Sequence, residues 1–389
     1  MYEWVIIGGG IHGCTIANFL LKSGKTIGSK LLIIDPNPEP MSKWKQNTEK
    51  IDMEFLRSPS VHHIDLDPLG LQKYASERKE ERGFYGPYNR PSLQLFNEHC
   101  KEILINQNLL QSWYQGTVNN VEKDEESWLI HTAEGKGVRG KNIVIAVSIN
   151  HQLNIPEWVK LYHSEDKQIY HVFDDNLRNL ENLQTPITVI GGGITAAHLT
   201  LKLCKLYPEK VTLLKRHSFR VNSFDSAPGW LGPKYLSGYA KIKDYDKRRT
   251  VIQEARNKGS IPRELYIRLM RLKKEMKLSI INGETVSAAK TPENDLLLHL
   301  KNDIKIKTKT VLLATGFVSE LPGDGWLHKL IKKENLQCAN CGYPIVKQTL
   351  EWCQHLYVAG PLAELEIGPV SRNIAGARKA AERITASIS

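Results

Sequence analysis

A glycine-rich turn occurs twice in this chain, each time directly after a short apolar segment and directly before a helical pattern. The first turn, Gly8 to Gly13 (GGGIHG), follows the apolar residues Trp4 to Ile7. The second, Gly191 to Ala196 (GGGITA), begins 183 residues later (191 − 8) and follows Ile187 to Ile190. Glycines at this spacing allow a tight turn, close approach of the backbone to a pyrophosphate, and close packing of helix on strand. The repeat therefore predicts two Rossmann-like units, each binding a dinucleotide.

The first turn carries the pattern expected for an adenine dinucleotide whose ribose has no 2′-phosphate. Its cofactor-binding residues are predicted to be Gly8, Gly10 and Gly13, because the backbone N–H groups at a helix N-terminus attract phosphate. A second apolar strand, Leu31 to Ile34, ends at Asp35, which is 22 residues after Gly13 (35 − 13). A carboxylate at this place accepts hydrogen bonds from a ribose and disfavours a 2′-phosphate.

The second turn differs from the first in the residues that follow the next strand, which are basic instead of acidic. Gly191, Gly193 and Thr195 are the predicted binding residues of the turn itself. The strand Val211 to Leu214 is followed by Lys215, Arg216 and His217, and Arg216 in this position can hold a 2′-phosphate. The sequence thus predicts NADPH at the second site, with a solvated surface arginine as the alternative interpretation of Arg216. Two dinucleotides in one chain indicate electron transfer between them, most simply from NADPH to FAD.

Composition limits the other function classes. The chain has 389 residues, of which 41% are hydrophobic and 24% charged, as in a globular protein of two or three domains. Its formal net charge of +11 is not gathered into a basic run interleaved with aromatics, so nucleic acid is not an expected partner. The apolar stretches are too short to cross a bilayer. Dinucleotides are themselves acidic ligands, although they account for only part of the excess positive charge.

Cysteine usage favours a reducing compartment. The six cysteines are spread along the chain, and the first strand follows the N-terminus without a signal-peptide pattern. A cytoplasmic location is therefore expected. Cys338 and Cys341 lie three residues apart, with Cys353 further on. This spacing is compatible with unpaired thiols, with a redox pair or with half of a zinc site, and no metal is predicted.

Two further segments near the end of the chain have the pattern of a strand followed by a cofactor contact. Val311 to Leu313 leads into Ala-Thr-Gly-Phe at 314–317, and Leu356 to Ala359 leads into Gly360. A helix is predicted to open at Gly368 and Pro369 and to run to about Ser387, since proline suits a first helical turn. The predicted cofactor contacts of these segments are Thr315, Gly316, Gly360, Gly368 and Pro369.

The order of these parts resembles the flavoproteins with two dinucleotide-binding domains. The resemblance implies an α/β fold with two Rossmann-like domains of the glutathione-reductase type, FAD at the first turn and NADPH at the second. The implied FAD domain is discontinuous, comprising residues 1–160 and 311–389, and the NADPH domain of residues 161–310 is inserted into it. The N-terminus of the last helix then faces the flavin, where it can stabilise negative charge on the reduced ring.

One branch of these flavoproteins, the N-hydroxylating monooxygenases of lysine and ornithine, is similar in more detail. The similarity rests on Trp44, followed by Phe-Leu-Arg-Ser at 55–58, and on Ala-Thr-Gly-Phe at 314–317. It implies that Trp44 contributes to the cofactor site and that Arg57 meets a substrate carboxylate; an arginine that braces the flavin domain is the alternative. Asp52 and Lys-Gly-Ser at 258–260 differ from the family pattern, so the substrate stays open.

The resemblance implies an FAD-dependent, NADPH-consuming monooxygenase that transfers one oxygen from a C4a-flavin hydroperoxide to a small amine or other soft nucleophile. The expected partner is a small molecule, with a carboxylate-bearing one as an option and a homo-oligomer left open. No catalytic side chain is predicted, because the flavin supplies the oxygen chemistry. One alternative is an NADPH-dependent flavin oxidoreductase that reduces a thiol, quinone or protein, and another is a dinucleotide-dependent binding protein.

Overall fold

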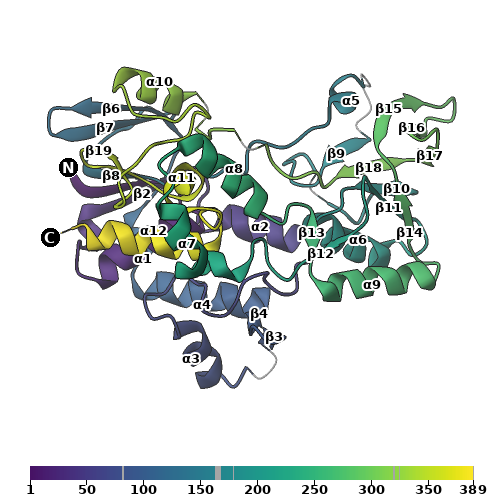
Figure 1. Ribbon diagram of the computed structural model, residues 1–389, viewed down its shortest axis with the longest axis horizontal. Helices are drawn as coiled ribbons and strands as arrows, with labels where there is room; N and C mark the ends of the chain where they lie inside the picture. The colour runs from purple at the N-terminus through teal and green to yellow at the C-terminus, as the bar shows by residue number, and fades with distance from the viewer. Residues whose placement is uncertain (81–82, 163–167, 178, 319, 324, 389) are drawn as a thin grey trace.

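The two largest sheets of the chain each have their own helices and lie side by side along the long axis of the molecule (Figure 1). The computed structural model describes residues 1–80, 83–162, 168–177, 179–318, 320–323 and 325–388. The first sheet is built from both ends of the chain, and the second from its middle. The α/β fold with two Rossmann-like units is thereby confirmed.

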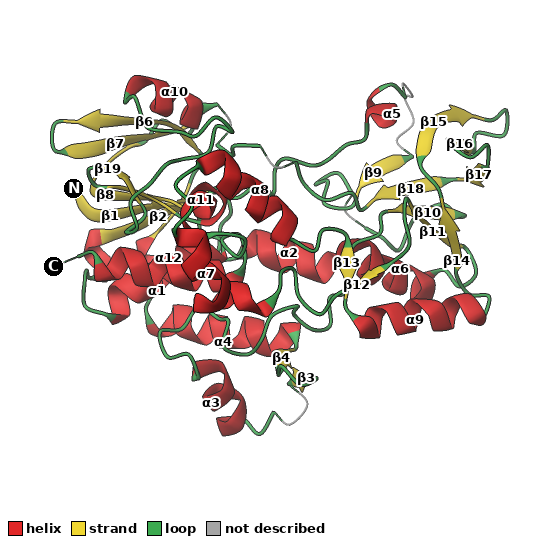
Figure 2. Cartoon of the chain, viewed as in Figure 1, coloured by secondary structure: helices red, strands yellow, loops and turns green. Residues whose placement is uncertain are grey.

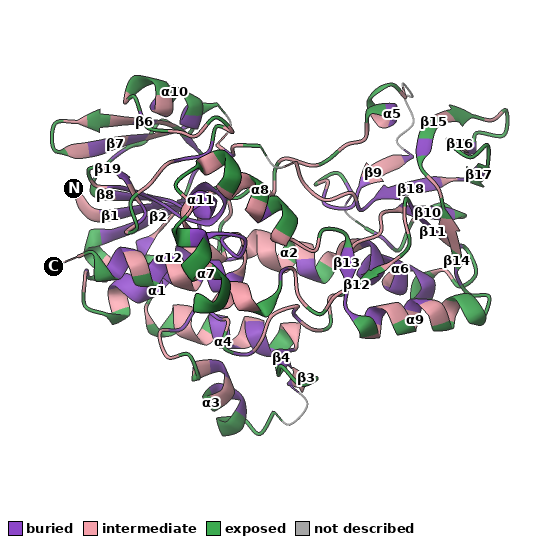
Figure 3. Cartoon of the chain, in the orientation of Figure 1, coloured by how far each residue is buried: buried purple, intermediate pink, exposed green. Residues whose placement is uncertain are grey.

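The first sheet has the order β19-β20-β8-β1-β2-β5, with the hairpin β6–β7 attached through β8. Its strands are β1 (Tyr2–Ile7), β2 (Leu31–Asp35), β5 (Trp113–Gln115), β6 (Val118–Asp124), β7 (Ser127–Thr132), β8 (Gly137–Ile145), β19 (Glu351–Cys353) and β20 (Leu356–Val358). The central strands β1, β2, β8 and β20 are parallel. The parts of these strands at the centre of the sheet, such as Val5 to Ile7 and Ile143 to Ile145, are apolar, as expected where both faces of a sheet are covered, and Figure 3 shows them buried.

Helices on one face of this sheet place the first glycine turn. Helix α1 (Ile11–Lys22) follows β1 directly and packs against the last helix, α12 (Ile374–Ala386), with α4 (Leu93–Asn106) below them (Figure 1). The buried side of α1 includes Cys14, Ile16 and Leu20. The remaining elements of this lobe are α2 (Ser42–Lys50), α3 (Gly70–Glu77), β3 (Phe84–Tyr85), β4 (Arg90–Pro91), α10 (Trp326–Lys333) and α11 (Glu364–Ile367).

The second sheet is parallel throughout, with the order β14-β11-β10-β18-β9. Its strands are β9 (Ile169–His171), β10 (Ile187–Ile190), β11 (Val211–Lys215), β14 (Ser279–Asn282) and β18 (Thr310–Leu313). Helices α6 (Ile194–Leu206) and α9 (Arg263–Lys274) cover one face, and an antiparallel meander lies on the other side (Figure 2). That meander comprises β15 (Thr285–Lys290), β16 (Leu296–Leu300) and β17 (Lys305–Thr308), and α5 (Glu157–Lys160) packs against it.

An inserted segment between β11 and α9 leaves the second lobe and reaches the first. It contains β12 (Arg220–Val221), α7 (Pro233–Ala240), α8 (Tyr245–Ala255) and β13 (Ser260–Ile261). Helix α8 packs on α11 of the first lobe. Tyr239 of α7 donates a hydrogen bond to the Leu365 carbonyl at 2.9 Å. The two lobes are therefore joined by this contact as well as by the crossing chain segments.

The expected domain boundary at residues 310 and 311 needs correction. Strand β18 pairs with β10 along its whole length, from Ile187 opposite Thr310 to Ile190 opposite Leu313. Val311 to Leu313 therefore belong to the second sheet, and the chain returns to the first lobe only after Leu313. An apolar run before Ala-Thr-Gly does not reveal which sheet it joins, because both sheets are parallel and buried.

The predicted start of the last helix is also wrong. Helix α12 begins at Ile374, and Gly368 and Pro369 lie in a turn before it. Gly368 has φ 92°, a left-handed conformation that ends α11. The Pro369 carbonyl accepts a hydrogen bond from the Arg256 guanidinium at 3.3 Å. Asn373 has an extended backbone (φ −95°, ψ 171°) and is the N-cap of α12, so Pro369 is not in a first helical turn.

Candidate functional site

The first glycine turn has the shape of a phosphate cradle. Gly8 has φ 106°, and a Cβ there would lie 2.7 Å from the Ala146 carbonyl oxygen. A Cβ on Gly13 would lie 1.9 Å from the Gly8 carbonyl oxygen, so α1 can pack this closely only with glycine. Around Gly10, by contrast, a Cβ would have no neighbour within 4 Å, and no side chain caps α1 there. The open helix N-terminus fits the pyrophosphate of FAD.

Asp35 is fixed beside this turn at the end of β2. One carboxylate oxygen accepts a hydrogen bond from the Gly9 N–H at 2.6 Å, and the other accepts from the Asn37 backbone N–H at 2.9 Å. The Trp113 ring lies over Gly9, and its indole N–H donates to the Asn37 carbonyl at 3.1 Å. Trp113 was not singled out from the sequence, because its contact with the turn depends on β5 pairing beside β2.

The second turn repeats the same backbone with different surroundings. A Cβ on Gly191 would lie 2.5 Å from the Ala314 carbonyl oxygen, and Gly193 precedes α6, whose first turn contains Thr195. At the end of β11, Lys215 is buried and donates to the His217 carbonyl at 3.0 Å. Arg216 extends into solvent with 73% of its side chain exposed, 3.9 Å from Glu284. Of these neighbouring cations, Arg216 is thus the better placed to meet a 2′-phosphate.

Thr315 and Gly316 lie where the two crossing segments of the chain run side by side. The Thr315 hydroxyl donates to the Asn154 carbonyl at 2.5 Å, and the Asn154 N–H donates to the Gly316 carbonyl at 3.0 Å. Leu153 and Phe317 form an antiparallel bridge. These two predicted cofactor-binding residues therefore also join the two chain segments that connect the lobes.

The two residues carried by the resemblance to N-hydroxylating enzymes are both engaged within the protein. Trp44 donates from its indole N–H to the Asn97 side-chain oxygen at 3.0 Å. Arg57 donates to four carbonyl oxygens of the inserted segment, those of residues 222, 223, 224 and 260, and to the Ser260 hydroxyl. Burial lowers the pKa of Arg57, which still remains a cation. The geometry favours the bracing interpretation of Arg57 over a contact with a substrate carboxylate.

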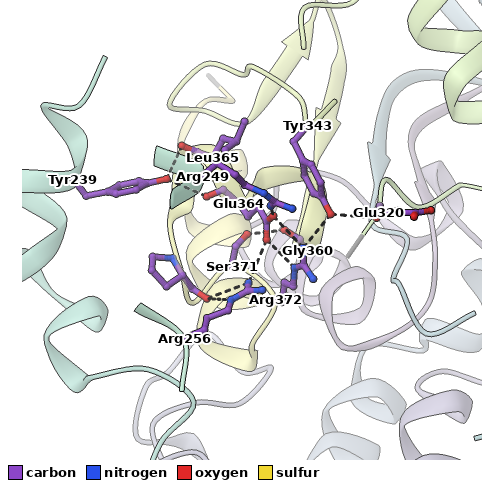
Figure 4. Close-up of polar contacts among 11 residues, drawn as sticks. Tyr239, Arg249, Arg256, Glu320, Tyr343, Gly360, Glu364, Leu365, Ser371 and Arg372 are labelled. Atoms are coloured by element: carbon purple, nitrogen blue, oxygen red, sulfur yellow. Dashed lines mark hydrogen bonds and ion pairs between the residues drawn. The ribbon is translucent and has the colours of Figure 1, made fainter. Parts of the chain in front are cut away.

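Gly360 and His12 connect the end of the first sheet to the glycine turn. Gly360 has φ 64°, and a Cβ there would lie 3.7 Å from the His12 ring. The Ser371 hydroxyl donates to the Gly360 carbonyl at 2.6 Å (Figure 4). Both ring nitrogens of His12 are buried, and the Arg372 backbone is a hydrogen-bonding neighbour of the ring. Burial lowers the pKa of His12 to about 4, so the imidazole is neutral at pH 7. His12 was missed because the fingerprint assigns no role to that position.

The cysteines offer no disulfide and no metal cluster in the described part of the chain. All six thiols are free, and no group of three or more His, Cys, Asp or Glu side chains there could hold a metal ion. Cys338 and Cys341 flank a turn that is closed by the Gly342 N–H on the Ala339 carbonyl at 2.8 Å. Burial raises the pKa of the Cys338 thiol, which disfavours the reactive thiolate.

The fold and the two turns define the class: a flavoprotein with two dinucleotide-binding lobes. The family model described as L-lysine 6-monooxygenase/L-ornithine 5-monooxygenase matches residues 90–319, more than half of the chain. A second model, described as FAD-NAD(P)-binding, matches residues 5–150. The chain belongs to the L-lysine 6-monooxygenase/L-ornithine 5-monooxygenase family. It is a flavin-dependent monooxygenase that uses FAD and NADPH.

Solved structures share this fold at low sequence identity. Ornithine hydroxylase from Pseudomonas aeruginosa is 16% identical with a TM-score of 0.76, and covers 100% of this chain and 98% of its own. The FAD-bound cadaverine monooxygenase of desferrioxamine biosynthesis from Erwinia amylovora is 15% identical with a TM-score of 0.75, and the match covers 100% of this chain and 94% of that enzyme. L-lysine 6-monooxygenase from Pseudomonas syringae is 12% identical with a TM-score of 0.74, and the match covers 100% of this chain and 99% of that enzyme. Comparison with curated proteins gave no match.

Proposed function

We propose that this enzyme hydroxylates the nitrogen of a small amine, with NADPH as the electron donor and FAD as the cofactor that activates O₂. One observation carries the proposal: two glycine turns in a chain of this family, an acid after the first and an exposed arginine after the second. The named relatives act on ornithine, cadaverine and lysine. All three substrates are primary amines, which supports the choice of substrate class.

In this proposal, the protein's own residues bind and orient rather than transfer protons. Gly8, Gly10 and Gly13 present the N-terminus of α1 to the FAD pyrophosphate, and Asp35 accepts hydrogen bonds from the ribose. We assign Trp44 and the turns at Gly360, Gly368 and Pro369 to the remaining sides of the flavin site. FAD, when bound and reduced, supplies the reaction with O₂.

The second turn then has the complementary role. Gly191, Gly193 and Thr195 present the N-terminus of α6 to the NADPH pyrophosphate, and Arg216 meets the 2′-phosphate. Thr315 and Gly316 hold the crossing segments that set the distance between the two sites. We assign residues up to about 150 and from about 318 onward to the FAD domain, on the strand pairing described above.

The cellular setting is proposed on separate grounds. No helix in the described residues is long and apolar enough to span a bilayer. We propose a cytoplasmic location because six free thiols suit a reducing compartment.

The test is coupling of NADPH oxidation to product. FAD-loaded protein is mixed with NADPH, O₂ and a panel of primary amines, and hydroxylamine and hydrogen peroxide are both quantified. We expect at least one amine to give hydroxylamine in proportion to NADPH consumed. Stoichiometric hydrogen peroxide with every amine, together with reduction of a quinone or disulfide, would instead establish the oxidoreductase alternative.

A further inference from the structure

The first lobe has a groove between helices α1, α3 and α4, which follow one another downward in Figure 1. Helix α1 contributes only Asn18 and Lys22, from its second half, so the groove lies away from the glycine turn at the start of this helix. Its volume is about 340 Å³, which suits a small organic molecule. Its lining contains none of the residues assigned above to FAD or NADPH.

Two side chains in the wall of this groove are buried and have polar atoms without a partner. Asn18 has no exposed surface, and its Nδ2 donates to the Ile64 carbonyl at 2.9 Å. That carbonyl can only accept, so the orientation of the amide is fixed. Asn18 Oδ1 and Nδ1 of His99, a residue that is 3% exposed, have no hydrogen-bond partner in the described part of the chain. Leaving such atoms unpaired costs free energy, which a ligand with matching groups can recover.

Both of these side chains offer a hydrogen-bond acceptor. The Asn18 Oδ1 atom can only accept. Burial lowers the pKa of His99 to about 4, so its ring is neutral at pH 7 and one of its nitrogens carries no hydrogen. The ring is held in place by the rings of His63 and Tyr74, with centroids 5.0 and 5.2 Å away. The matching ligand therefore brings N–H donors.

The charges along the groove favour a cation, although the whole chain has a net charge of +11. Its lining holds four carboxylates and two ammonium groups, those of Asp65, Asp67, Glu77 and Glu102 and those of Lys22 and Lys73. Lys22 pairs with Asp65 and Lys73 pairs with Asp67, each at 2.6 Å. Glu77 and Glu102 are thus the excess of two negative charges (4 − 2).

Charges at the rim do not reverse this excess. Arg78 lies outside the lining and pairs with Glu102. Further carboxylates lie on the same side: burial raises the pKa of Tyr74, Arg78 lowers it, and Glu102, Glu98 and Glu80 raise it again. More anions than cations therefore act on the Tyr74 ring, which is part of the lining.

The end of α4 adds to this negative potential. Asn106 and Gln107 line the groove where α4 ends, and the last turn of this helix has no basic residue. The carbonyl end of a helix carries partial negative charge and attracts cations. No group of three or more His, Cys, Asp or Glu side chains in the described residues could hold a metal ion. The carboxylates are thus spread along the groove, as suits an organic cation rather than a metal ion.

We propose that this groove binds a small aliphatic amine in its ammonium form, with Asn18 and His99 as hydrogen-bond acceptors and Glu77 and Glu102 as charge partners. The alkyl chain packs against Tyr74 and Ile103, which also line the groove. This inference goes beyond the proposed function, because it assigns a second amine site that is separate from the substrate position at the flavin.

The test is calorimetric titration of the FAD-loaded protein without NADPH, so that no turnover occurs. Putrescine is the probe, and butanediol is its uncharged analogue of the same length. We expect putrescine to bind and to raise the temperature of unfolding, since a ligand that binds only the folded state stabilises it. Butanediol should do neither. Binding of butanediol as tight as that of putrescine, or no binding of putrescine, would overturn the proposal.

Asn106→Arg is the decisive variant, because it adds a cation to the wall of the groove. The exposed last turn of α4 accommodates a basic residue favourably, so the fold is retained. Repulsion between the new guanidinium and the ligand should weaken putrescine binding about tenfold or more. Unchanged binding in this variant would place putrescine elsewhere, for example at the flavin, and would contradict the assignment.

Gln253→Arg is the matched control. Gln253 is exposed in the last turn of α8, which also lacks a basic residue, and it lies outside the groove. The substitution adds the same charge to the chain and should change putrescine binding less than twofold. Equal weakening in Gln253→Arg and Asn106→Arg would show a general effect of net charge and would overturn the groove as the site.

This outcome is separable from that of the proposed function. Putrescine binding that Asn106→Arg weakens, with no hydroxylamine from any amine, contradicts the N-hydroxylase assignment and leaves the amine groove standing. Hydroxylamine formation without any calorimetric binding that Asn106→Arg weakens contradicts the amine groove and leaves the N-hydroxylase assignment standing.

Discussion

The two glycine turns have the same backbone and opposite surroundings. In the first, the carboxylate of Asp35 is held at the turn by the Gly9 N–H, and the Trp113 ring covers the outer side. In the second, the residue at the equivalent strand end is Lys215, which is buried, and the next residue, Arg216, points into solvent with 73% of its side chain exposed. A tightly enclosed site suits a cofactor that stays bound, and an open one suits a cofactor that must enter and leave in each cycle.

Gly13→Val should have the largest effect. The new Cβ would lie 1.9 Å from the Gly8 carbonyl oxygen, so α1 must move away from β1. We expect a loss of roughly 3 kcal/mol or more of unfolding free energy, by analogy with overpacking, and a protein without flavin. Thermal unfolding and the flavin absorbance of purified protein measure both. Gly10→Ala is the matched control: its Cβ meets nothing within 4 Å, so stability should be retained. Equal destabilisation by the two changes would contradict this description of the turn.

Arg216→Ala should alter the choice of nicotinamide cofactor. Loss of a charge-assisted contact to the 2′-phosphate corresponds to about 1.5–3 kcal/mol, so KM for NADPH should rise about 10- to 100-fold while KM for NADH changes little. Steady-state kinetics with NADPH and with NADH give the two KM values. Arg271→Ala, on α9 and similarly exposed at 69%, is the control and should change neither value. If KM rose by the same factor for NADPH and for NADH, Arg216 would not contact the 2′-phosphate.

Acid should destabilise the first lobe through His12. Its folded pKa of about 4 lies below the ordinary value of 6.5, so the unfolded state binds more protons between these two values. Stability is therefore present above pH 6.5 and falls as the pH drops toward 4, by roughly 2 kcal/mol at pH 5 for this residue. Denaturant unfolding of wild type and His12→Asn at pH 7 and pH 5 isolates the contribution. An identical pH dependence in the two proteins would contradict a neutral, buried His12.

Asp35→Asn should weaken FAD binding alone. The amide retains one acceptor oxygen but loses the charge that strengthens the 2.6 Å hydrogen bond from Gly9. We expect about a tenfold increase in the dissociation constant of FAD and no change for NADPH. Titration of FAD-free protein, followed by flavin fluorescence, measures the first, and cofactor kinetics measure the second. A larger effect on NADPH than on FAD would reverse the assignment of the two turns.

The fold was predictable where local patterns decide it, and less so where distant segments meet. The strand, glycine turn and helix at Ile187 to Leu206 form as expected because each element depends on its own residues. Pro369 lies in a turn before α12, where its carbonyl accepts a hydrogen bond from Arg256, more than a hundred residues earlier in the chain. Arg57 braces the inserted segment because that segment folds back across the lobes.

The most direct test of the central claim is anaerobic reduction of the bound flavin, followed by stopped-flow absorbance. The two-turn account predicts one FAD per chain and reduction by NADPH at least tenfold faster than by NADH at equal, subsaturating concentration, with the preference abolished in Arg216→Ala. A purified protein that binds no FAD, or a flavin that NADPH and NADH reduce equally fast, would contradict it.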